Sequence, residues 1–379
     1  MSNIVVLGAG MVGSAIAIDL CREYKVILSD LNQQRLEVLK AQHPLQVKAA
    51  DLSEKATIQK IIKDAELVIG AVPGFMGFEM LKTCIEAGKN VVDISFFDED
   101  PFQLEDLAQK HEVIVLTDCG VAPGMDNIIL GYHNALMEVQ AFECYVGGLP
   151  VKRSWPYEYK APFSPIDVVE EYTRPARVVE GGKIVTKPAM SDAEYIEIDP
   201  IGTLEAFNTD GLRTLVKTMT VPNMKEKTLR YPGHIEYMRV LRETGLFDKE
   251  PIEVKGVKIR PLDVTTALLF PMWKLGPEED EFTVMHINVV GMENGQRKTY
   301  TYHMFDKYDA DTKTSSMART TGYTCTAAAR LVLNGDFTRK GINPPEYLGA
   351  NANCFQKLLG YLEERNIRYL VSEHVNDGQ

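Results

Sequence analysis

The sequence lacks the features that mark membrane, secreted and zinc-binding proteins. None of its apolar runs reaches the ~18 residues needed to cross a bilayer. The N-terminal stretch MSNIVVLGAG has no basic segment ahead of its apolar residues, so we expect no secretory signal peptide. The six cysteines form no CxxC pair and no Cys/His cluster with zinc-ligand spacing. We therefore expect reduced thiols, no metal site and a cytoplasmic protein.

Basic charge is also in short supply. The chain has 41 Lys and Arg residues against 53 Asp and Glu residues, which gives a net charge of −12. Nucleic acids and anionic membrane surfaces attract proteins with an excess of positive charge, so we expect neither partner. The contents of 45% hydrophobic and 25% charged residues are ordinary for a globular protein. At roughly 150 residues per domain, a length of 379 residues indicates two or three domains.

Short apolar runs alternate with helical patterns from the N-terminus to Leu116. Strands that alternate with helices at this spacing predict a parallel sheet whose crossovers are helices. We therefore expect an α/β fold with a Rossmann-type, doubly wound parallel sheet over residues 1–123. The runs that suit buried strands are Ile4–Leu7, Val26–Leu28, Gln46–Ala49, Leu67–Gly70, Val91–Ile94 and Val113–Leu116.

The pattern changes after Pro123, where aromatic residues and prolines become frequent. Asn294-Gly295 lies between two alternating runs and predicts a hairpin, because both turn positions need a positive φ. A hairpin indicates an inserted α+β domain with a mixed or antiparallel sheet, to which we assign residues 124–320. We expect residues 321–379 to form C-terminal helices that pack back on the first domain. Expected strands of the second domain lie near Glu143–Val146, Ile252–Ile259, Phe282–Val290 and Lys298–Met304.

A glycine-rich loop follows the first expected strand and opens the first helix. In its GxGxxG pattern, Gly8 allows a tight turn, Gly10 lets the backbone approach a pyrophosphate, and Gly13 permits close packing of helix and strand. The helix N-terminus supplies N–H groups for phosphate. The position of the pattern in a βαβ unit predicts a dinucleotide site that includes Met11 and Val12.

Asp30 ends the second expected strand. A carboxylate at this place accepts hydrogen bonds from a ribose 2′-hydroxyl and repels a 2′-phosphate, which favours NAD over NADP. The alternative is a turn aspartate in the segment Asp30–Asn32, and Arg35, one helical turn on, weakens the preference. Two further turns are expected to border the cofactor. Asp51 and Leu52 are expected beside the adenine, and Ala71, Val72 and Pro73 beside the nicotinamide half.

Further motifs run in order through most of the chain. They are Asp93–Phe97, Glu99–Phe102, Asp118–Met125, Tyr145–Pro150, Glu171–Ala176, Glu205–Phe207, Asp210–Arg213, Thr228–His234 and Met317–Tyr323. Together they resemble the saccharopine dehydrogenase family, and the resemblance is greatest to its lysine 6-dehydrogenase branch. Agreement of this extent is far more specific than a glycine pattern alone.

One loop separates the branches of this family. Glutamate-forming saccharopine dehydrogenases look like LDPG where this chain has Val121-Ala122-Pro123-Gly124, so their aspartate is replaced by Ala122. The chain is also shorter than those enzymes, and both points favour a substrate without a glutamate arm. The resemblance implies oxidative deamination of L-lysine at the ε-carbon with NAD, giving allysine, which cyclises to a piperideine carboxylate. We assign Ser95, Val121, Ala122 and Pro123 to the cofactor site.

This reaction sets requirements for the substrate site. The α-carboxylate of the substrate needs a cationic anchor, best met by a bidentate arginine. The resemblance places a substrate contact at Arg230, and Arg213 is the second candidate; the alternative for each is a surface ion pair. We expect Tyr159, Phe163 and Phe96 to line the pocket, with ordinary aromatic packing as the alternative for the first two.

The ε-amine must be neutral when the hydride leaves, because an ammonium cannot donate electrons to the forming C=N bond. The pKa of a lysine amine is ~10.4, so the site must desolvate the amine or offer a base. The candidates for the base are His234 and Asp126. The alternative for Asp126 is the N-cap of the helix that follows it, and desolvation with water is an alternative to any base.

Other functions stay open at this stage. A second enzymatic hypothesis is a saccharopine dehydrogenase or a related carboxyamine-forming reductase. A hypothesis of another class is a non-catalytic NAD-binding regulator on the same fold. The family resemblance also implies a homodimer through the second domain, whose open sheet otherwise leaves exposed edges.

Overall fold

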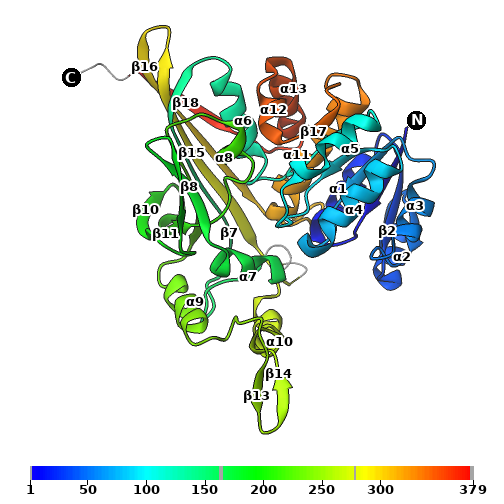
Figure 1. Cartoon of the computed structure of the whole chain (residues 1–379), viewed down its shortest axis with the longest axis horizontal. Coiled ribbons are helices and arrows are strands. Elements are labelled where there is room, and N and C mark those ends of the chain that lie inside the picture. The colour runs from blue at the N-terminus through cyan, green and yellow to red at the C-terminus, as the bar shows by residue number, and fades with distance from the viewer. Residues whose placement is uncertain (1, 162–164, 277–278, 376–379) are drawn as a thin grey trace. The chain divides into compact units, whose positions relative to one another are not determined.

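The computed structural model describes residues 2–161, 165–276 and 279–375, and the chain folds into two compact units (Figure 1). The first unit contains Met1–Glu138 and Met317–Tyr369, drawn from blue to cyan and from orange to red. The second unit contains Val139–Ser316 and Leu370–Gln379. The chain thus leaves the first unit after Glu138, returns to it at Met317 and leaves it again after Tyr369.

The first unit is built on a seven-stranded sheet with the strand order β17-β6-β5-β4-β1-β2-β3. Neighbouring strands pair in parallel, and the central Val- and Ile-rich runs are buried on both faces. The predicted doubly wound α/β fold is confirmed, and each of the predicted runs is a strand. The strands are β1 (Asn3–Leu7), β2 (Lys25–Asp30), β3 (Gln46–Ala49), β4 (Leu67–Gly70), β5 (Asn90–Asp93), β6 (Ile114–Leu116) and β17 (Gly341–Asn343).

The helices of the first unit pack apolar faces against this sheet and one another. Ile58, Ile61 and Ile62 share one face of α3 and are buried. They belong to a core cluster that also holds Leu81 and Ile85 of α4. No helix within the described residues is both long enough and apolar enough to span a membrane. The helices are α1 (Met11–Leu20), α2 (Gln33–Gln42), α3 (Lys55–Ile62), α4 (Gly74–Glu86), η1 (Pro101–Leu104), α5 (Glu105–Lys110), α6 (Met125–Asn134), α11 (Ser316–Leu333), α12 (Pro345–Gly349) and α13 (Ala352–Glu363).

The second unit is built on a mixed nine-stranded sheet, as predicted. Its main path is β10-β11-β12-β7-β15-β16-β18, and β8 joins β12 and carries β9. The pair β12–β7 is parallel, whereas β10–β11, β11–β12 and β15–β16 are antiparallel. The strands are β7 (Glu138–Pro150), β8 (Ala176–Glu180), β9 (Lys183–Lys187), β10 (Glu194–Ile198), β11 (Gly202–Asn208), β12 (Asn223–Arg230), β15 (Glu281–Glu293), β16 (Gln296–Lys307) and β18 (Leu370–Val375).

Two hairpin turns of the second unit share one backbone conformation. Asn294 and Gly295 have φ values of 52° and 80° between β15 and β16, so the predicted hairpin is confirmed. The segment Ile252–Ile259, expected as one strand, is instead a hairpin of β13 (Ile252–Val254) and β14 (Val257–Ile259). Its turn is Lys255-Gly256, where φ is 51° and 80°. The remaining helices of this unit are α7 (Pro165–Thr173), α8 (Leu215–Thr218), α9 (His234–Glu243) and α10 (Pro261–Trp273).

Helix α6 belongs to the first unit, although the sequence boundary at residue 124 placed it in the second. The reason is a close crossing with α12. A Cβ on Gly131 of α6 would lie 2.1 Å from the carbonyl oxygen of Glu346, and one on Gly349 of α12 would lie 1.9 Å from that of Ile128. The two helices therefore touch backbone to backbone. The C-terminal strand β18 belongs to the second unit, where it pairs with β16.

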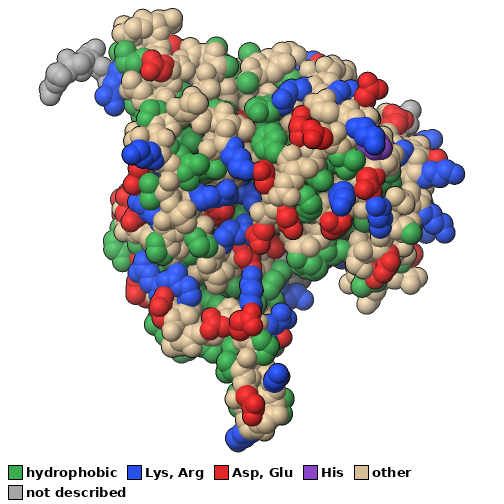
Figure 2. All heavy atoms as spheres, in the orientation of Figure 1, with side chains coloured by type: hydrophobic (Ala, Val, Ile, Leu, Met, Phe, Trp, Pro, Cys, Tyr) green, Lys and Arg blue, Asp and Glu red, His purple; other side chains and the backbone are tan. Residues whose placement is uncertain are grey.

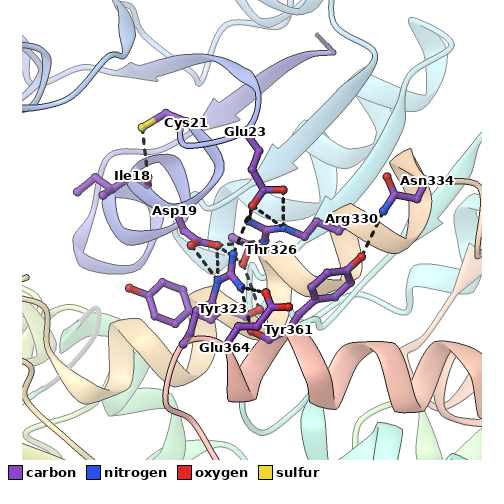
Figure 3. Close-up of polar contacts among 11 residues, drawn as sticks. Ile18, Asp19, Cys21, Glu23, Tyr323, Thr326, Arg330, Asn334, Tyr361 and Glu364 are labelled. Atoms are coloured by element: carbon purple, nitrogen blue, oxygen red, sulfur yellow. Dashed lines mark hydrogen bonds and ion pairs between the residues drawn. The ribbon is translucent and has the colours of Figure 1, made fainter.

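A buried cluster of charges joins α1 to the C-terminal part of the first unit (Figure 3). Asp19 of α1 is 1% exposed and accepts hydrogen bonds from Arg330 Nη1 at 3.1 Å and Arg365 Nε at 2.8 Å. It also accepts one from Thr326 Oγ1 at 2.7 Å. Arg330 in turn donates to Glu23 at 2.7 Å. Because the charges are paired away from water, loss of one partner leaves another uncompensated, which costs about 3–5 kcal/mol in such sites.

Replacement of Gly131 by alanine tests the α6–α12 crossing. We expect Gly131→Ala to lower the free energy of unfolding by about 1–3 kcal/mol, because the new methyl group has to displace the backbone of Glu346. The matched control is Gly360→Ala in α13, where a Cβ meets no described atom within 4 Å. The control is expected to stabilise the protein by up to about 1 kcal/mol through helix propensity. Equal stabilities in urea denaturation would contradict the backbone contact.

Candidate cofactor and substrate sites

In the glycine loop between β1 and α1, two of the three glycines are in close contact with neighbouring backbone. Gly8 has φ of 108°, and a Cβ there would lie 2.2 Å from the carbonyl oxygen of Ala71 in the turn after β4. A Cβ on Gly13 would lie 2.2 Å from the carbonyl oxygen of Gly8. These two glycines are therefore needed by the fold itself, because side chains at either position clash with backbone.

Gly10 differs from the other two glycines. It is the N-cap of α1, its φ is −63°, and a Cβ on it meets no described atom within 4 Å. The protein's own packing thus does not require a glycine at this position. A bare backbone at a helix N-terminus fits a pyrophosphate that approaches the N–H groups, as in nucleotide-binding loops. Met11 and Val12 are the first residues of the helix that these groups begin.

Asp30 is bonded to the glycine loop. Its Oδ2 accepts a hydrogen bond from the N–H of Ala9 at 2.7 Å, and its Oδ1 accepts one from the N–H of Asn32 at 2.8 Å. The carboxylate therefore makes the turn expected as the alternative, and it also fixes the loop that begins α1. Arg35 of α2 lies beside the same loop, with Nη2 3.4 Å from Ser14 Oγ of α1.

The other residues expected to bind the cofactor lie at the ends of neighbouring strands of the first unit. Ser95 follows β5 and is buried, with its Oγ donating to Asp93 at 2.9 Å. Leu52 is buried and Asp51 is exposed, where it bonds to Ser53. Their contacts with a cofactor stay predictions, as do those of Ala71, Val72 and Pro73 in the β4–α4 turn and of Val121, Ala122 and Pro123 before α6.

Asp126 lies buried in the first turn of α6. Its Oδ1 accepts a hydrogen bond from the N–H of Gly124 at 2.9 Å, and Gly124, not Asp126, is the N-cap of the helix. Its Oδ2 is buried and has no hydrogen-bond partner among the described residues. Burial raises the pKa of Asp126 to about 7, and the charge of nearby Glu346 acts in the same direction. The role of Asp126 as a base stays a prediction.

Arg230 ends β12 in the second unit and is 2% exposed. Its Nε donates to Tyr172 Oη at 3.1 Å, and its Nη1 donates to the carbonyl oxygen of Leu229 at 2.9 Å. Nη2 bonds to Tyr159 Oη at 3.4 Å and forms an ion pair with Glu171. The guanidinium also lies over the Tyr159 ring, with 4.4 Å between Cζ and the ring centre. Arg230 is thus an interior charge, not the surface ion pair given as its alternative.

His234 begins α9 and is buried in the same cluster. Its Nδ1 is 2.8 Å from the carbonyl oxygen of Tyr157, and its Nε2 is 2.9 Å from Tyr172 Oη. A carbonyl only accepts, so Nδ1 carries the proton and Nε2 accepts from the Tyr172 hydroxyl. Burial, helped by the charge of Arg230, lowers the pKa of His234 to about 3. Both nitrogens of a neutral ring are therefore in use, and a role as base stays a prediction.

Glu171 of α7 belongs to the Arg230 cluster, although sequence reasoning gave it no role. It pairs with Arg230, and its side chain is 19% exposed. Burial raises the pKa of Glu171, while the charge of Arg230 opposes the shift. The available signal was its place in the Glu171–Ala176 motif beside Tyr172, but its partner lies far along the chain.

Of the other residues expected to bind the substrate, Tyr159 belongs to this cluster through its contact with Arg230. Arg213 is buried between β11 and α8. Phe96 follows β5 in the first unit and is half-buried. Phe163 lies outside the described residues. Tyr159 is buried and packs edge-on against Trp273 of α10, with 5.5 Å between the ring centres.

Charged groups elsewhere in the second unit pair with one another. A hollow of about 430 Å³ beside β8, β10 and β12 is lined by Lys187, Lys225 and Lys227. Lys227 bonds to Glu194 at 2.7 Å and Lys225 to Glu143 at 2.9 Å. Figure 2 shows the same mixture of basic and acidic side chains over the visible face. The described residues contain no group of three or more His, Cys, Asp or Glu side chains that could hold a metal ion.

Comparisons with known proteins identify the family of the two parts of the chain. The model of the saccharopine dehydrogenase NADP binding domain matches residues 4–116, and that of the saccharopine dehydrogenase C-terminal domain matches residues 120–367. In structure, the chain is similar to a saccharopine dehydrogenase (L-Glu forming) from Saccharomyces cerevisiae, with a TM-score of 0.79 and 20% identity. That match covers 99% of this chain and 100% of the yeast chain.

Relatives in sequence have several activities in their names. The saccharopine dehydrogenase [NADP(+), L-glutamate-forming] of Schizosaccharomyces pombe is 23% identical, over 78% of this chain and 82% of the relative. The carboxyaminopropylagmatine dehydrogenase of Synechocystis is 20% identical, over 90% and 92%. The mitochondrial alpha-aminoadipic semialdehyde synthase of Mus musculus is 24% identical over 69% of this chain, which spans only 30% of that relative.

The two family models follow one another along the chain and meet between β6 and α6. The first covers the nucleotide-binding loop and the strands around it. The second covers Arg230 and its partners and then returns to the first unit through α11, α12 and α13. With a nucleotide cofactor-binding domain over residues 4–116, the chain belongs to the saccharopine dehydrogenase family of oxidoreductases.

Proposed function

We propose that this protein oxidises the ε-carbon of L-lysine with NAD, giving allysine and ammonium. The observation that supports a dinucleotide-dependent reaction is at Gly10. A side chain there would meet no described atom within 4 Å, whereas side chains at Gly8 and Gly13 would clash with backbone. Such a loop fits a dinucleotide pyrophosphate. Asp30, bonded to the same loop, supports NAD, because its negative charge repels a 2′-phosphate. The name of the matching family model mentions NADP, and Arg35 beside the loop is the feature that favours it.

The balance of the reaction assigns tasks to the protein. Protonated lysine, NAD⁺ and water give allysine, ammonium, NADH and a proton. When bound, the nicotinamide supplies the acceptor for the hydride that leaves the ε-carbon. The protein must therefore hold the dinucleotide, bind the lysine head group and receive a proton from the ε-ammonium. Asp126, whose pKa burial raises to about 7, is the candidate acceptor in the first unit.

Lysine is supported by the loop Val121-Ala122-Pro123-Gly124, which has no carboxylate at Ala122, where the resemblance gives glutamate-forming enzymes an aspartate. The second candidate function is a saccharopine dehydrogenase or another carboxyamine dehydrogenase. It is favoured by the relatives from S. pombe and Synechocystis, which align over most of their own length.

We also propose a cytoplasmic homodimer that forms through the second unit. Free thiols at all six cysteines support a reducing compartment. The edge strand β18 supports association, because it exposes Leu370, Val371 and Val375, and proteins rarely leave such an edge uncovered.

The substrate is tested with the purified protein in the oxidative direction. With NAD at alkaline pH, L-lysine is expected to yield NADH at a rate far above that with saccharopine, because the proposed site fits a substrate without the glutamate arm. NADH absorbance measures the rate. Turnover of saccharopine but not of lysine would favour the second candidate function. NAD binding without turnover of either compound or of a carboxyamine would favour a non-catalytic regulator.

Two substitutions at one position test cofactor choice. Asp30→Ala is expected to weaken NAD binding roughly tenfold or more through the lost ribose hydrogen bonds, and to raise the ratio of NADP to NAD affinity. Asp30→Asn keeps an oxygen for the Ala9 N–H but removes the charge, so it separates repulsion from turn geometry. Cofactor titrations followed by fluorescence give the affinities. If both affinities survive Asp30→Ala unchanged, Asp30 is a turn residue only.

A further inference from the structure

In the cluster around Arg230, the group that reaches solvent is an anion. The guanidinium of Arg230 is 2% exposed, whereas the side chain of its ion-pair partner Glu171 is 19% exposed. Oε2 of Glu171 bonds to Arg230, and Oε1 has no hydrogen-bond partner among the residues that the structure describes. A ligand that approaches this pair from solvent therefore meets the carboxylate first.

Arg230 is held in place by a chain of hydrogen bonds with a fixed direction. Nε of Arg230 donates to Tyr172, Tyr172 donates to His234, and His234 donates to the carbonyl oxygen of Tyr157. The direction follows because the guanidinium only donates and the carbonyl only accepts. The chain fixes the plane of the guanidinium, so that Nη2 is presented to Glu171.

Among the groups around Glu171, Arg230 is the cation that stabilises its carboxylate. Burial raises the pKa of Glu171, Arg230 on β12 lowers it, and Asp167 on α7 raises it further. Burial also raises the pKa of Tyr159 and of Tyr172, so both phenols are neutral at physiological pH. His234 on α9 is neutral because burial lowers its pKa to about 3. The partner best suited to Oε1 of Glu171 is therefore a cation that donates hydrogen bonds.

We propose that Glu171 binds the α-ammonium group of the substrate, and that Arg230 positions Glu171 for this contact. The inference rests on the proposed function only in taking an α-amino acid as the substrate. It selects amino acids with a free α-ammonium, and it gives Arg230 a supporting role in place of the carboxylate anchor expected from the sequence.

The α-ammonium is favoured over the ε-ammonium for a chemical reason. An ion pair with a carboxylate stabilises the protonated form of an amine and so raises the pKa of that amine. The ε-amine must lose its proton before the hydride leaves, and a tight ion pair opposes this loss. The α-ammonium keeps its charge throughout the reaction, so an ion pair at that end of lysine does not interfere.

The test removes each partner of the contact in turn. 6-Aminohexanoate is lysine without the α-ammonium, and isothermal titration calorimetry measures the binding of both compounds to the purified full chain. The wild type is expected to bind lysine about 10–100-fold more tightly, as for a lost hydrogen bond to a charged group. Glu171→Gln is expected to bind the two compounds almost equally, through loss of lysine affinity.

Two further variants separate binding from folding. Glu170→Gln is the matched control, because Glu170 precedes Glu171 on α7, is 21% exposed and pairs instead with Arg174 and Lys249. It should keep the preference for lysine. Glu171→Asp keeps the charge and should retain part of the preference, and it decides the question if thermal unfolding shows that Glu171→Gln does not fold.

The outcomes distinguish this inference from the proposed function. Equal binding of lysine and 6-aminohexanoate by the wild type, or a full preference for lysine in Glu171→Gln, would overturn the inference. The same holds if the wild type binds neither compound, or if Glu171→Asp loses the whole preference while folded. Absence of NADH formation with lysine would refute the proposed reaction, and the calorimetric comparison would still decide the role of Glu171.

Discussion

The first unit depends on a carboxylate that is buried with two arginines. Asp19 lies on the helix that begins at the glycine loop, and Arg330 and Arg365 come from the other end of the chain. An isolated charge in such a place is strongly unfavourable, so the native position of α1 requires the C-terminal helices. The orientation of the candidate cofactor loop is thereby linked to residues more than 300 positions away in the sequence.

The same principle of enclosed charge operates differently in the second unit. Arg230 is surrounded by two tyrosines and a carboxylate, and a neutral histidine fixes one of these tyrosines. The Asp19 cluster joins helices of the first unit, and each of its described carboxylates that Arg330 contacts is bonded to an arginine. In the Arg230 cluster, Oε1 of Glu171 has no hydrogen-bond partner among the described residues. The free oxygen of Glu171 is what distinguishes a group able to bind a ligand from a carboxylate such as Asp19, whose two oxygens are both bonded to arginines.

Much of the first unit follows from patterns within short segments. The strands are local apolar runs, and Gly8 and Gly13 have the close packing that the spacing alone predicts. The strand β17 was missed, because three residues carry no periodicity and pair only with a distant edge. The packing of α6 against α12 could not be predicted, because it depends on Gly131 and Gly349 meeting across a helix crossing. Glu171 had no assigned role for the same reason, since its partner Arg230 lies on another element.

The return of the chain to the first unit has a consequence for synthesis. When the ribosome has made residues up to Ser316, β6 still lacks its neighbour β17, and Asp19 lacks both arginines. The second unit, apart from its edge strand β18, is by then fully translated. Until the C-terminal residues are translated, the nucleotide-binding unit of the nascent chain therefore has an open sheet edge at β6. The interior charge of Asp19 is also unpaired until then.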